Sequence, residues 1–171
     1  MTEIRTKRLR IGEISSEHEE ELMDLLCDRK IGETFLLPEY EEREAARPLA
    51  VRYEKLSADP ARFVAGIFLE DLLIGLVNEV DRQEGAMEIG YLIRPELWNR
   101  GYATEMLQAV LPALHGRGFS RVIAGYFEEN PASGRVMEKA GMHPLSRTDS
   151  VEHRGKVHRC LYYESTLEEM K

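Results

Sequence analysis

Cysteine is scarce in this 171-residue chain, which contains only two. Cys27 and Cys160 stand alone, without a CxxC pair or an even ladder of spacings, so the sequence indicates neither a disulfide framework nor a zinc knuckle. The chain also lacks the ~20 consecutive apolar residues of a membrane span and the continuous hydrophobic stretch of a secretory signal. We therefore expect a reducing, cytoplasmic location and no membrane partner.

Positive charge is also in short supply. Lysine and arginine total 23 against 31 aspartates and glutamates, which leaves a formal net charge of −8. A protein that neutralises phosphates along a duplex needs the opposite sign, so we expect no nucleic-acid partner. An acidic surface attracts cations, and amines, polyamines or basic polypeptide termini are compatible substrates. The same charge is equally typical of an ordinary soluble surface.

Several motifs that carry chemistry are missing. The chain has no GxxxxGK[ST] or GxGxxG loop for a nucleotide and no GxSxG elbow for a hydrolase. His18 and Glu19 do not begin an HExxH motif, because Leu22 occupies the position of the second histidine. His153 and His158 fall in a predicted hairpin without matching carboxylates. We therefore expect no metal site and no hydrolase triad.

What is present is the composition of an ordinary globular protein, with 43% hydrophobic and 32% charged residues. No repeat or linker divides the chain, and we expect a single domain over residues 1–171. Hydrophobic periodicity predicts strands at residues 7–14, 62–69, 72–80, 86–94 and 120–127, and a final hairpin within 144–166. It predicts helices at 17–29, 39–56, 101–115 and 130–141. Pro48 is expected to break or kink the second helix.

The segment from Tyr91 to Glu105 (YLIRPELWNRGYATE) is predicted as a strand, a short loop with a glycine, and the start of a helix. Such a joint directs free backbone N–H groups at one point, where the positive end of the helix dipole also lies, so it suits an anion. Gly101 has two interpretations that the sequence leaves open. Either a ligand approaches the backbone too closely for a Cβ, or the glycine relieves a tight turn.

Two stretches then resemble a known family. IGYLIRPELWNRGYATEML, followed by NPASGRVMEKAGM, is similar to the acyl-coenzyme A binding core of the GNAT N-acetyltransferases, in the branch of the ribosomal-protein-alanine N-acetyltransferases. The resemblance is close from Ile89 to Met142 and loose over the opening TKRLRI. It implies an α/β fold: a single GNAT-like domain with a mixed, mostly antiparallel sheet of about seven strands, a splayed strand pair and about four flanking helices.

The resemblance also implies a coenzyme site. Ile93 would exchange main-chain hydrogen bonds with the pantetheine arm, and Asn130 and Ser133 match the family's residues near the sulfur. The main-chain amides that would bind the pyrophosphate belong to Asn99, Arg100, Gly101, Tyr102, Ala103 and Thr104. The family's loop commonly starts with Gln or Arg, where this chain has Trp98, which we interpret as a packing residue. The position of the tyrosine acid found in many relatives is Met137, which excludes a tyrosine donor there.

The chemistry of acetyl transfer suggests roles for a few side chains. A thiol is a much better leaving group than an alcohol, so Ser133 is expected to donate a hydrogen bond to the leaving thiolate rather than a full proton. Glu88 lies on the strand that leads into the gap between the splayed strands, and it is the candidate base. Glu79, on the neighbouring strand, is the substitute candidate. Main-chain N–H groups near Ile93 would bind the oxyanion.

The sequence therefore predicts transfer of an acetyl group from acetyl-CoA to a primary amine, either a protein N-terminal amine or a small-molecule amine. Two rivals stay open: a coenzyme A-binding regulatory module without turnover, and a phosphate-ligand protein that uses the same helix end for a nucleotide. The sequence also leaves open whether the chain is a monomer or a homodimer.

Overall fold

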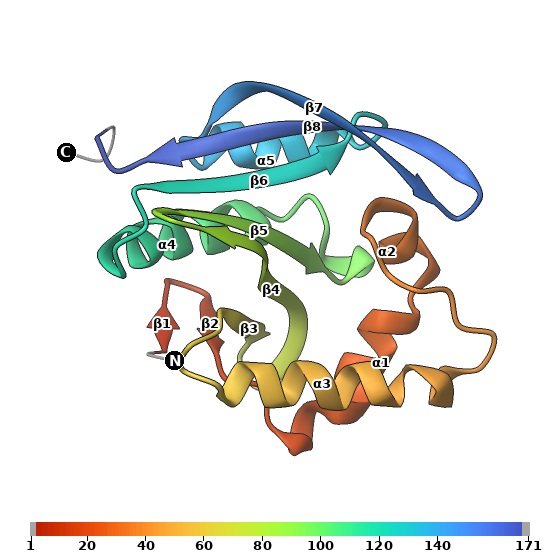
Figure 1. The fold of residues 1–171 in the computed structure, drawn as a ribbon. Coiled ribbons are helices and arrows are strands. Elements are labelled where there is room, and N and C mark those ends of the chain that lie inside the picture. Colours follow the sequence, from red (N-terminus) through yellow and green to blue (C-terminus); the bar gives the residue numbers. More distant parts are fainter. Residues whose placement is uncertain (1–2, 169–171) are drawn as a thin grey trace. The chain divides into compact units, whose positions relative to one another are not determined.

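A computed structural model describes residues 3–168 of the chain (Figure 1). The strands are β1 (Ile4–Arg5), β2 (Leu9–Gly12), β3 (Val64–Leu69), β4 (Leu72–Gln83), β5 (Ala86–Ile93), β6 (Arg121–Phe127), β7 (His143–His153) and β8 (Lys156–Thr166). The α-helices are α1 (Glu19–Cys27), α2 (Arg29–Thr34), α3 (Arg47–Ala58), α4 (Tyr102–Gly116) and α5 (Pro131–Lys139). Short 3₁₀ turns η1 (Ser16–His18), η2 (Arg43–Ala46) and η3 (Pro95–Leu97) complete the list.

The strands form a sheet in the order β1-β2-β3-β4-β5-β6-β8-β7. β5 and β6 pair in parallel, whereas the β1–β2, β2–β3, β3–β4, β6–β8 and β8–β7 pairs are antiparallel. The expected mixed, mostly antiparallel α/β fold is therefore confirmed. Over residues 3–168 it has eight strands rather than about seven, and five α-helices rather than about four.

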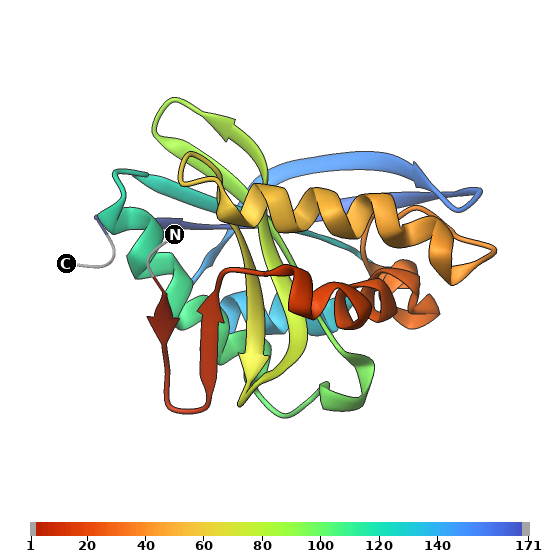
Figure 2. The same cartoon turned by 90° about the horizontal axis from the view of Figure 1, so that it is seen from below.

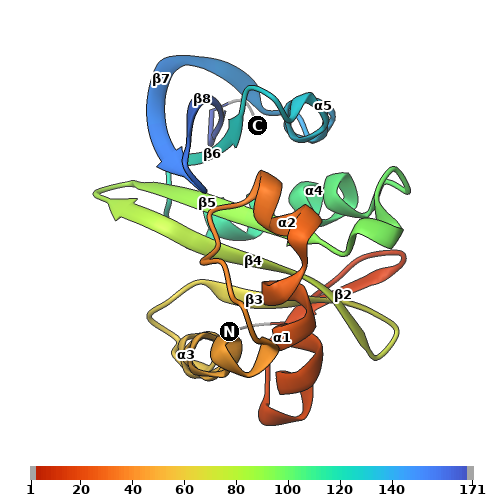
Figure 3. The same cartoon turned by 90° about the vertical axis from the view of Figure 1, so that its right-hand side faces the viewer.

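The chain forms two compact units, and β4 and β5 contribute residues to both. The first unit contains residues 3–78 and 91–102 of the described part. Its core forms where α1 and the neighbouring α3 pack on the β3 and β4 residues of this unit (Figure 3). Leu22, Leu25 and Leu26 supply the helical side and Phe68 and Leu76 the sheet side, and each of these side chains is at most 1% exposed.

The second unit contains residues 79–90 and 103–168 of the described part. The long β7–β8 hairpin and α5 lie together in this unit, as the blue part of Figure 1 shows. In α4 the predicted apolar stripe is buried throughout, at Met106, Leu107, Val110, Leu111 and Leu114. The final hairpin also has its predicted turn, because Arg154 (φ 51°) and Gly155 (φ 71°) take the two left-handed conformations that a tight type I′ turn requires.

Two predicted helices were wrong in their boundaries, and one strand was not predicted. The helix expected over 39–56 begins only at Arg47, so Pro48 lies in the first turn of α3, where its missing N–H is not needed, and it breaks nothing. The helix expected over 17–29 ends at Cys27, because Asp28 is extended and its side chain accepts a hydrogen bond from Ile31 N at 3.0 Å to begin α2. β1 was missed, because two residues show no periodicity.

The first-unit end of β5 lies unusually close to β4. An ideal Cβ on Gly75 would be 2.3 Å from the main-chain oxygen of Leu92, which belongs to the neighbouring backbone. Arg94 N donates to Ile74 O at 2.7 Å at the same place. The glycine therefore permits the approach that holds Ile93 and the following loop against the sheet.

Candidate functional site

The loop between β5 and α4 has the backbone conformation that the anion-site prediction needs. After η3, Asn99 (φ 60°) and Gly101 (φ 80°) are both left-handed, and α4 begins at Tyr102. Asparagine and glycine are the residues that tolerate this region best. Ala103 and Thr104 occupy the first turn of α4, where main-chain N–H groups have no partner within the helix. The loop and the helix start thus supply a run of amides.

Gly101 can now be interpreted more closely. Its φ of 80° by itself favours a residue without a Cβ, which supports the tight-turn interpretation. A Cβ built there would also lie 3.4 Å from Nη2 of Arg8, so the space beside the glycine is already partly taken. Close approach by a ligand stays a prediction.

Trp98 does more than pack. Its indole Nε1 donates a hydrogen bond to the main-chain oxygen of Ile93 at 2.7 Å, and the residue is 39% exposed. Because Arg94 N points to Ile74 in β4, the main-chain groups of the preceding Ile93 point to the opposite edge of β5. One lone pair of that oxygen is used by Trp98. The exchange of main-chain hydrogen bonds between Ile93 and pantetheine stays a prediction.

In the second unit, Asn130 and Ser133 are in direct contact. Asn130 Nδ2 donates to Ser133 Oγ at 3.0 Å, and Ser133 N donates to Asn130 O at 3.1 Å. Asn130 stands at the N-cap position of α5, but its side chain makes no capping hydrogen bond. It therefore orients the serine hydroxyl instead of the helix end. Met137 is 1% exposed and fills the core, consistent with the absence of a tyrosine donor at that position.

The two candidate bases are both paired with arginine. Glu88 Oε2 accepts from Arg147 Nη1 at 2.8 Å and its side chain is 17% exposed, whereas the side chain of Glu79, bonded to Arg82, is only 4% exposed. A base must reach the acceptor or a water molecule, so Glu88 is the better placed of the two.

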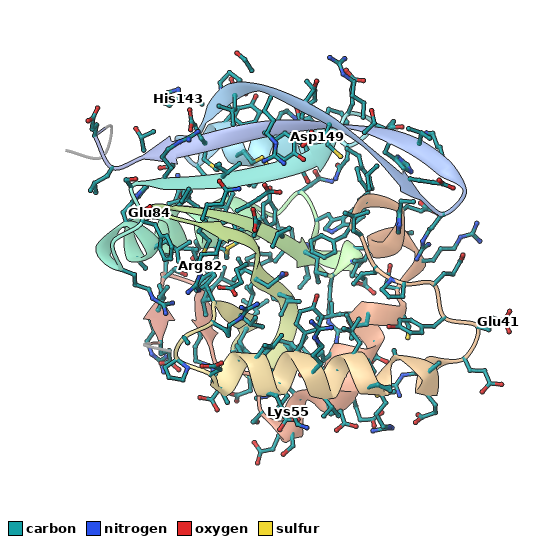
Figure 4. All side chains as sticks on the ribbon, viewed as in Figure 1. Glu41, Lys55, Arg82, Glu84, His143 and Asp149 are labelled. Carbon is teal, nitrogen blue, oxygen red and sulfur yellow. The ribbon has the colours of Figure 1, made fainter. Side chains whose placement is uncertain are left out.

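Arg147 lies at an irregularity in β7. The register with β8 shifts between Leu145 and Thr148, and Arg147, which lies within this shift, donates to Glu88. The guanidinium also binds Asp149, a labelled residue of β7 in Figure 4, and lies over the Tyr162 ring at 4.0 Å. The hydrogen bond from Tyr162, followed by that from Arg147, lowers the pKa of Asp149.

One of the hairpin histidines, His158, has a carboxylate from outside the hairpin beside it. Glu129 Oε1 lies 3.4 Å from its Nδ1, and Lys156 Nζ lies 2.8 Å from the same oxygen. Hydrogen bonding from Lys156 is the main cause that lowers the pKa of Glu129 to about 2. Within residues 3–168, no three His, Cys, Asp or Glu side chains are placed to hold a metal ion. None of the helices in that range is long and apolar enough for a membrane span.

A hollow of about 250 Å³ lies within the first unit, beside the loop that follows β5. Its lining comes from α1, α2, the residue between these helices and the segment after Ile93, namely Asp24, Leu25, Asp28, Ile31, Arg94, Pro95 and Glu96. Three of these are carboxylates, and Arg94 Nε is engaged with Leu73 O at 2.9 Å. The lining therefore combines three carboxylates and one arginine with three apolar residues.

The sequence pattern of the acetyltransferase (GNAT) domain matches residues 8–143 of the chain. The chain belongs to the GNAT acetyltransferase family. This match includes residues of both units. It contains the loop before α4, the Asn130–Ser133 pair and both candidate bases. Membership assigns transfer of an acetyl group from acetyl-CoA to an amine, the reaction that the sequence resemblance implied.

Known relatives of this GNAT protein agree with the assignment. The uncharacterized N-acetyltransferase YoaA of Bacillus subtilis (strain 168) is 27% identical over 143 residues, which cover 81% of each chain. A GNAT-family acetyltransferase from Bacillus anthracis has a TM-score of 0.82 at 24% identity, over 99% of this chain and 100% of that one. RimL, a ribosomal L7/L12 alpha-N-protein acetyltransferase solved with coenzyme A, has a TM-score of 0.85 at 19% identity, over 98% and 99%. The two solved structures share the fold.

Sequence reasoning missed three features of the GNAT site region. Arg8 carried no signal beyond the loose match of TKRLRI. Arg147 carried none, because its partner Glu88 is 59 positions away in the chain. The hollow is lined by residues more than 60 positions apart in the chain, and no local pattern reveals such a set.

Proposed function

We propose that this GNAT enzyme acetylates a protein N-terminal amine, and that residues 1–171 act as one N-acetyltransferase domain. The observation that carries the proposal is the run of amides at Asn99–Thr104, with left-handed Asn99 and Gly101, in the segment for which the sequence resemblance implies coenzyme binding. In this proposal Asn99, Arg100, Gly101, Tyr102, Ala103 and Thr104 bind the pyrophosphate through main-chain N–H groups.

The thioester end of acetyl-CoA is assigned to Ile93, Asn130 and Ser133. Main-chain groups of Ile93 bind the pantetheine arm, and N–H groups near it stabilise the oxyanion that develops on the acetyl carbonyl. Ser133 accepts a hydrogen bond from Asn130, and a hydroxyl that accepts can still donate its own hydrogen. That donation stabilises the thiolate as the carbon–sulfur bond breaks.

The choice of acceptor follows from the amine's own basicity. An α-amine with a pKa near 7.8 is already ~15% neutral at pH 7, whereas a lysine amine is neutral in roughly one molecule per few thousand. The nucleophile must be neutral, so an N-terminal amine needs little help from a base. The carboxylate-lined hollow beside Arg94 suits an incoming ammonium group, and the solved relative RimL acts on a protein N-terminus. Both support this acceptor class.

An acceptor screen tests the proposal. The protein and acetyl-CoA are incubated with a peptide that has a free N-terminus, the same peptide blocked at its N-terminus but containing lysine, a polyamine and an aminoglycoside. Intact-mass analysis should show one acetyl group on the free N-terminus. Acetylation of the polyamine or aminoglycoside alone would contradict the proposed acceptor and identify a small-molecule amine in its place.

The same samples separate the two rival functions. Calorimetric binding of acetyl-CoA without an adduct on any acceptor would favour a regulatory module. Thermal stabilisation by ATP in place of acetyl-CoA would favour a nucleotide site, because only a ligand of the folded state raises its stability by mass action.

Glu88 as general base gives a separate prediction. Glu88→Gln keeps the size of the side chain but removes the proton acceptor, so the pH dependence of kcat should become flatter. The matched control is Glu79→Gln, which should leave the profile as in the wild type because Glu79 is almost fully buried against Arg82. An unaltered profile for Glu88→Gln would show that Glu88 is not the general base. A flattened profile for Glu79→Gln would assign that role to Glu79.

A further inference from the structure

Arg8 reaches from the β1–β2 turn to the loop that precedes α4. Its Nη1 donates a hydrogen bond to the main-chain oxygen of Arg100 at 3.0 Å. Its guanidinium also lies over the ring of Tyr102, with Cζ 4.3 Å from the centroid. These residues all belong to the first unit, although 92 positions separate Arg8 from Arg100. A single side chain thus contacts the two residues that flank Gly101.

The turn that carries Arg8 is itself held by Thr6. Thr6 Oγ1 accepts from Leu9 N at 2.9 Å and from Arg8 N at 3.4 Å, and Thr6 N donates to Leu9 O at 2.9 Å. β1 and β2, drawn in red in Figure 2, run side by side on either side of this turn. Arg8 therefore projects from a fixed base rather than from a loose terminus.

The hydrogen bond to Arg100 O has a consequence for the next residue. The C=O of Arg100 and the N–H of Gly101 belong to one planar trans peptide, so they point in opposite directions. When Arg8 binds the oxygen, the Gly101 N–H is directed away from Arg8. Because glycine has no Cβ, Gly101 can also adopt other φ values, so this peptide can rotate when no such contact holds it.

We propose that Arg8 is a positioning residue of the coenzyme site: it binds the back of the loop and thereby directs the Gly101 amide toward the diphosphate of acetyl-CoA. The proposal rests on the proposed function of the loop. It also gives the opening TKRLRI segment, which contains no group assigned to the reaction, a role in binding the donor.

Calorimetry with coenzyme A tests the proposal on three proteins: the wild type, Arg8→Ala and the control Arg5→Ala. Arg5 is an exposed arginine of the same hairpin that pairs with Glu3, so its loss removes the same charge without touching the loop. Arg8→Ala should weaken coenzyme A binding about tenfold, which is about 1.4 kcal/mol. Arg5→Ala should bind like the wild type. If Arg8→Ala also does, the proposal is overturned.

Two further readouts distinguish positioning from other roles. S-acetyl-pantetheine lacks the diphosphate, so kcat/KM with this donor should be the same for Arg8→Ala and the wild type; an equal loss with both donors would mean general damage to the fold and overturn the proposal. The tenfold effect should persist at high ionic strength, because it does not come from a charge on the phosphate. If the effect of Arg8→Ala disappears at high salt, Arg8 contacts the phosphate directly, and the positioning role is overturned. A wild type that binds no coenzyme A would refute the proposed function itself.

Discussion

Replacement of Gly101 by valine is expected to weaken acetyl-CoA binding by at least about 100-fold. A β-branched residue is a severe outlier at φ 80°, with a strain of ~1–3 kcal/mol, so the loop will relax toward a negative φ. The relaxed loop no longer aims the amides of Arg100, Gly101 and Tyr102 at one point. Loss of two charge-assisted hydrogen bonds of ~1.5–3 kcal/mol each corresponds to this factor, at about 1.4 kcal/mol per tenfold. Calorimetry with acetyl-CoA measures it.

Gly118 provides a matched control for the backbone strain. It is also left-handed, at φ 98°, and a Cβ built there meets nothing within 4 Å. Gly118→Val should lower thermal stability by an amount similar to Gly101→Val, yet it should bind acetyl-CoA as the wild type does. If both variants keep full affinity, the amides of the Asn99–Thr104 run do not hold the coenzyme, and the proposed site is wrong.

The second large effect is on stability. Gly75→Ala is expected to lower the free energy of unfolding by about 3 kcal/mol or more, because the added methyl would overlap a backbone oxygen that no side-chain rotation can move. The ideal Cβ lies 2.3 Å from Leu92 O and 2.9 Å from Cδ1 of Ile93. β5 would have to separate from β4 at the point where Arg94 N bonds Ile74 O. Urea unfolding, with midpoint and slope both fitted, measures the loss.

Gly116→Ala is the control for this experiment. Gly116 is the last residue of α4, and a Cβ there meets nothing within 4 Å. Alanine should raise stability there by roughly 0.5–1 kcal/mol, because it loses less conformational freedom than glycine in a helix. A Gly75→Ala protein that unfolds at the wild-type urea concentration would show that β5 can shift without penalty, and the close approach would lose its significance.

Much of the fold could be predicted because local sequence patterns specify many of its elements. The stripe of α4, the Arg154–Gly155 turn and the strands around Glu70 and Asp71 follow from periodicity and turn chemistry, and the structure confirms them. The helix boundaries before residue 60 were less predictable. Proline can stand in the first turn of a helix or mark a break between helical segments. The sequence does not show which applies to Pro48, and the structure places it in the first turn of α3.

The candidate site divides along the same line. The amide run from Asn99 to Thr104 and the Asn130–Ser133 pair lie within short segments whose residue types and spacing are readable. The sequence alone therefore determined the reaction family, and it predicted the segments that we propose bind the coenzyme. Three contacts were decided by the tertiary structure alone. Arg8 binds the main-chain oxygen of Arg100, Arg147 pairs with Glu88, and the backbone of Leu92 lies close to Gly75. Each of these contacts joins residues at least 17 positions apart, and the fold, not any local preference of the chain, brings such residues together.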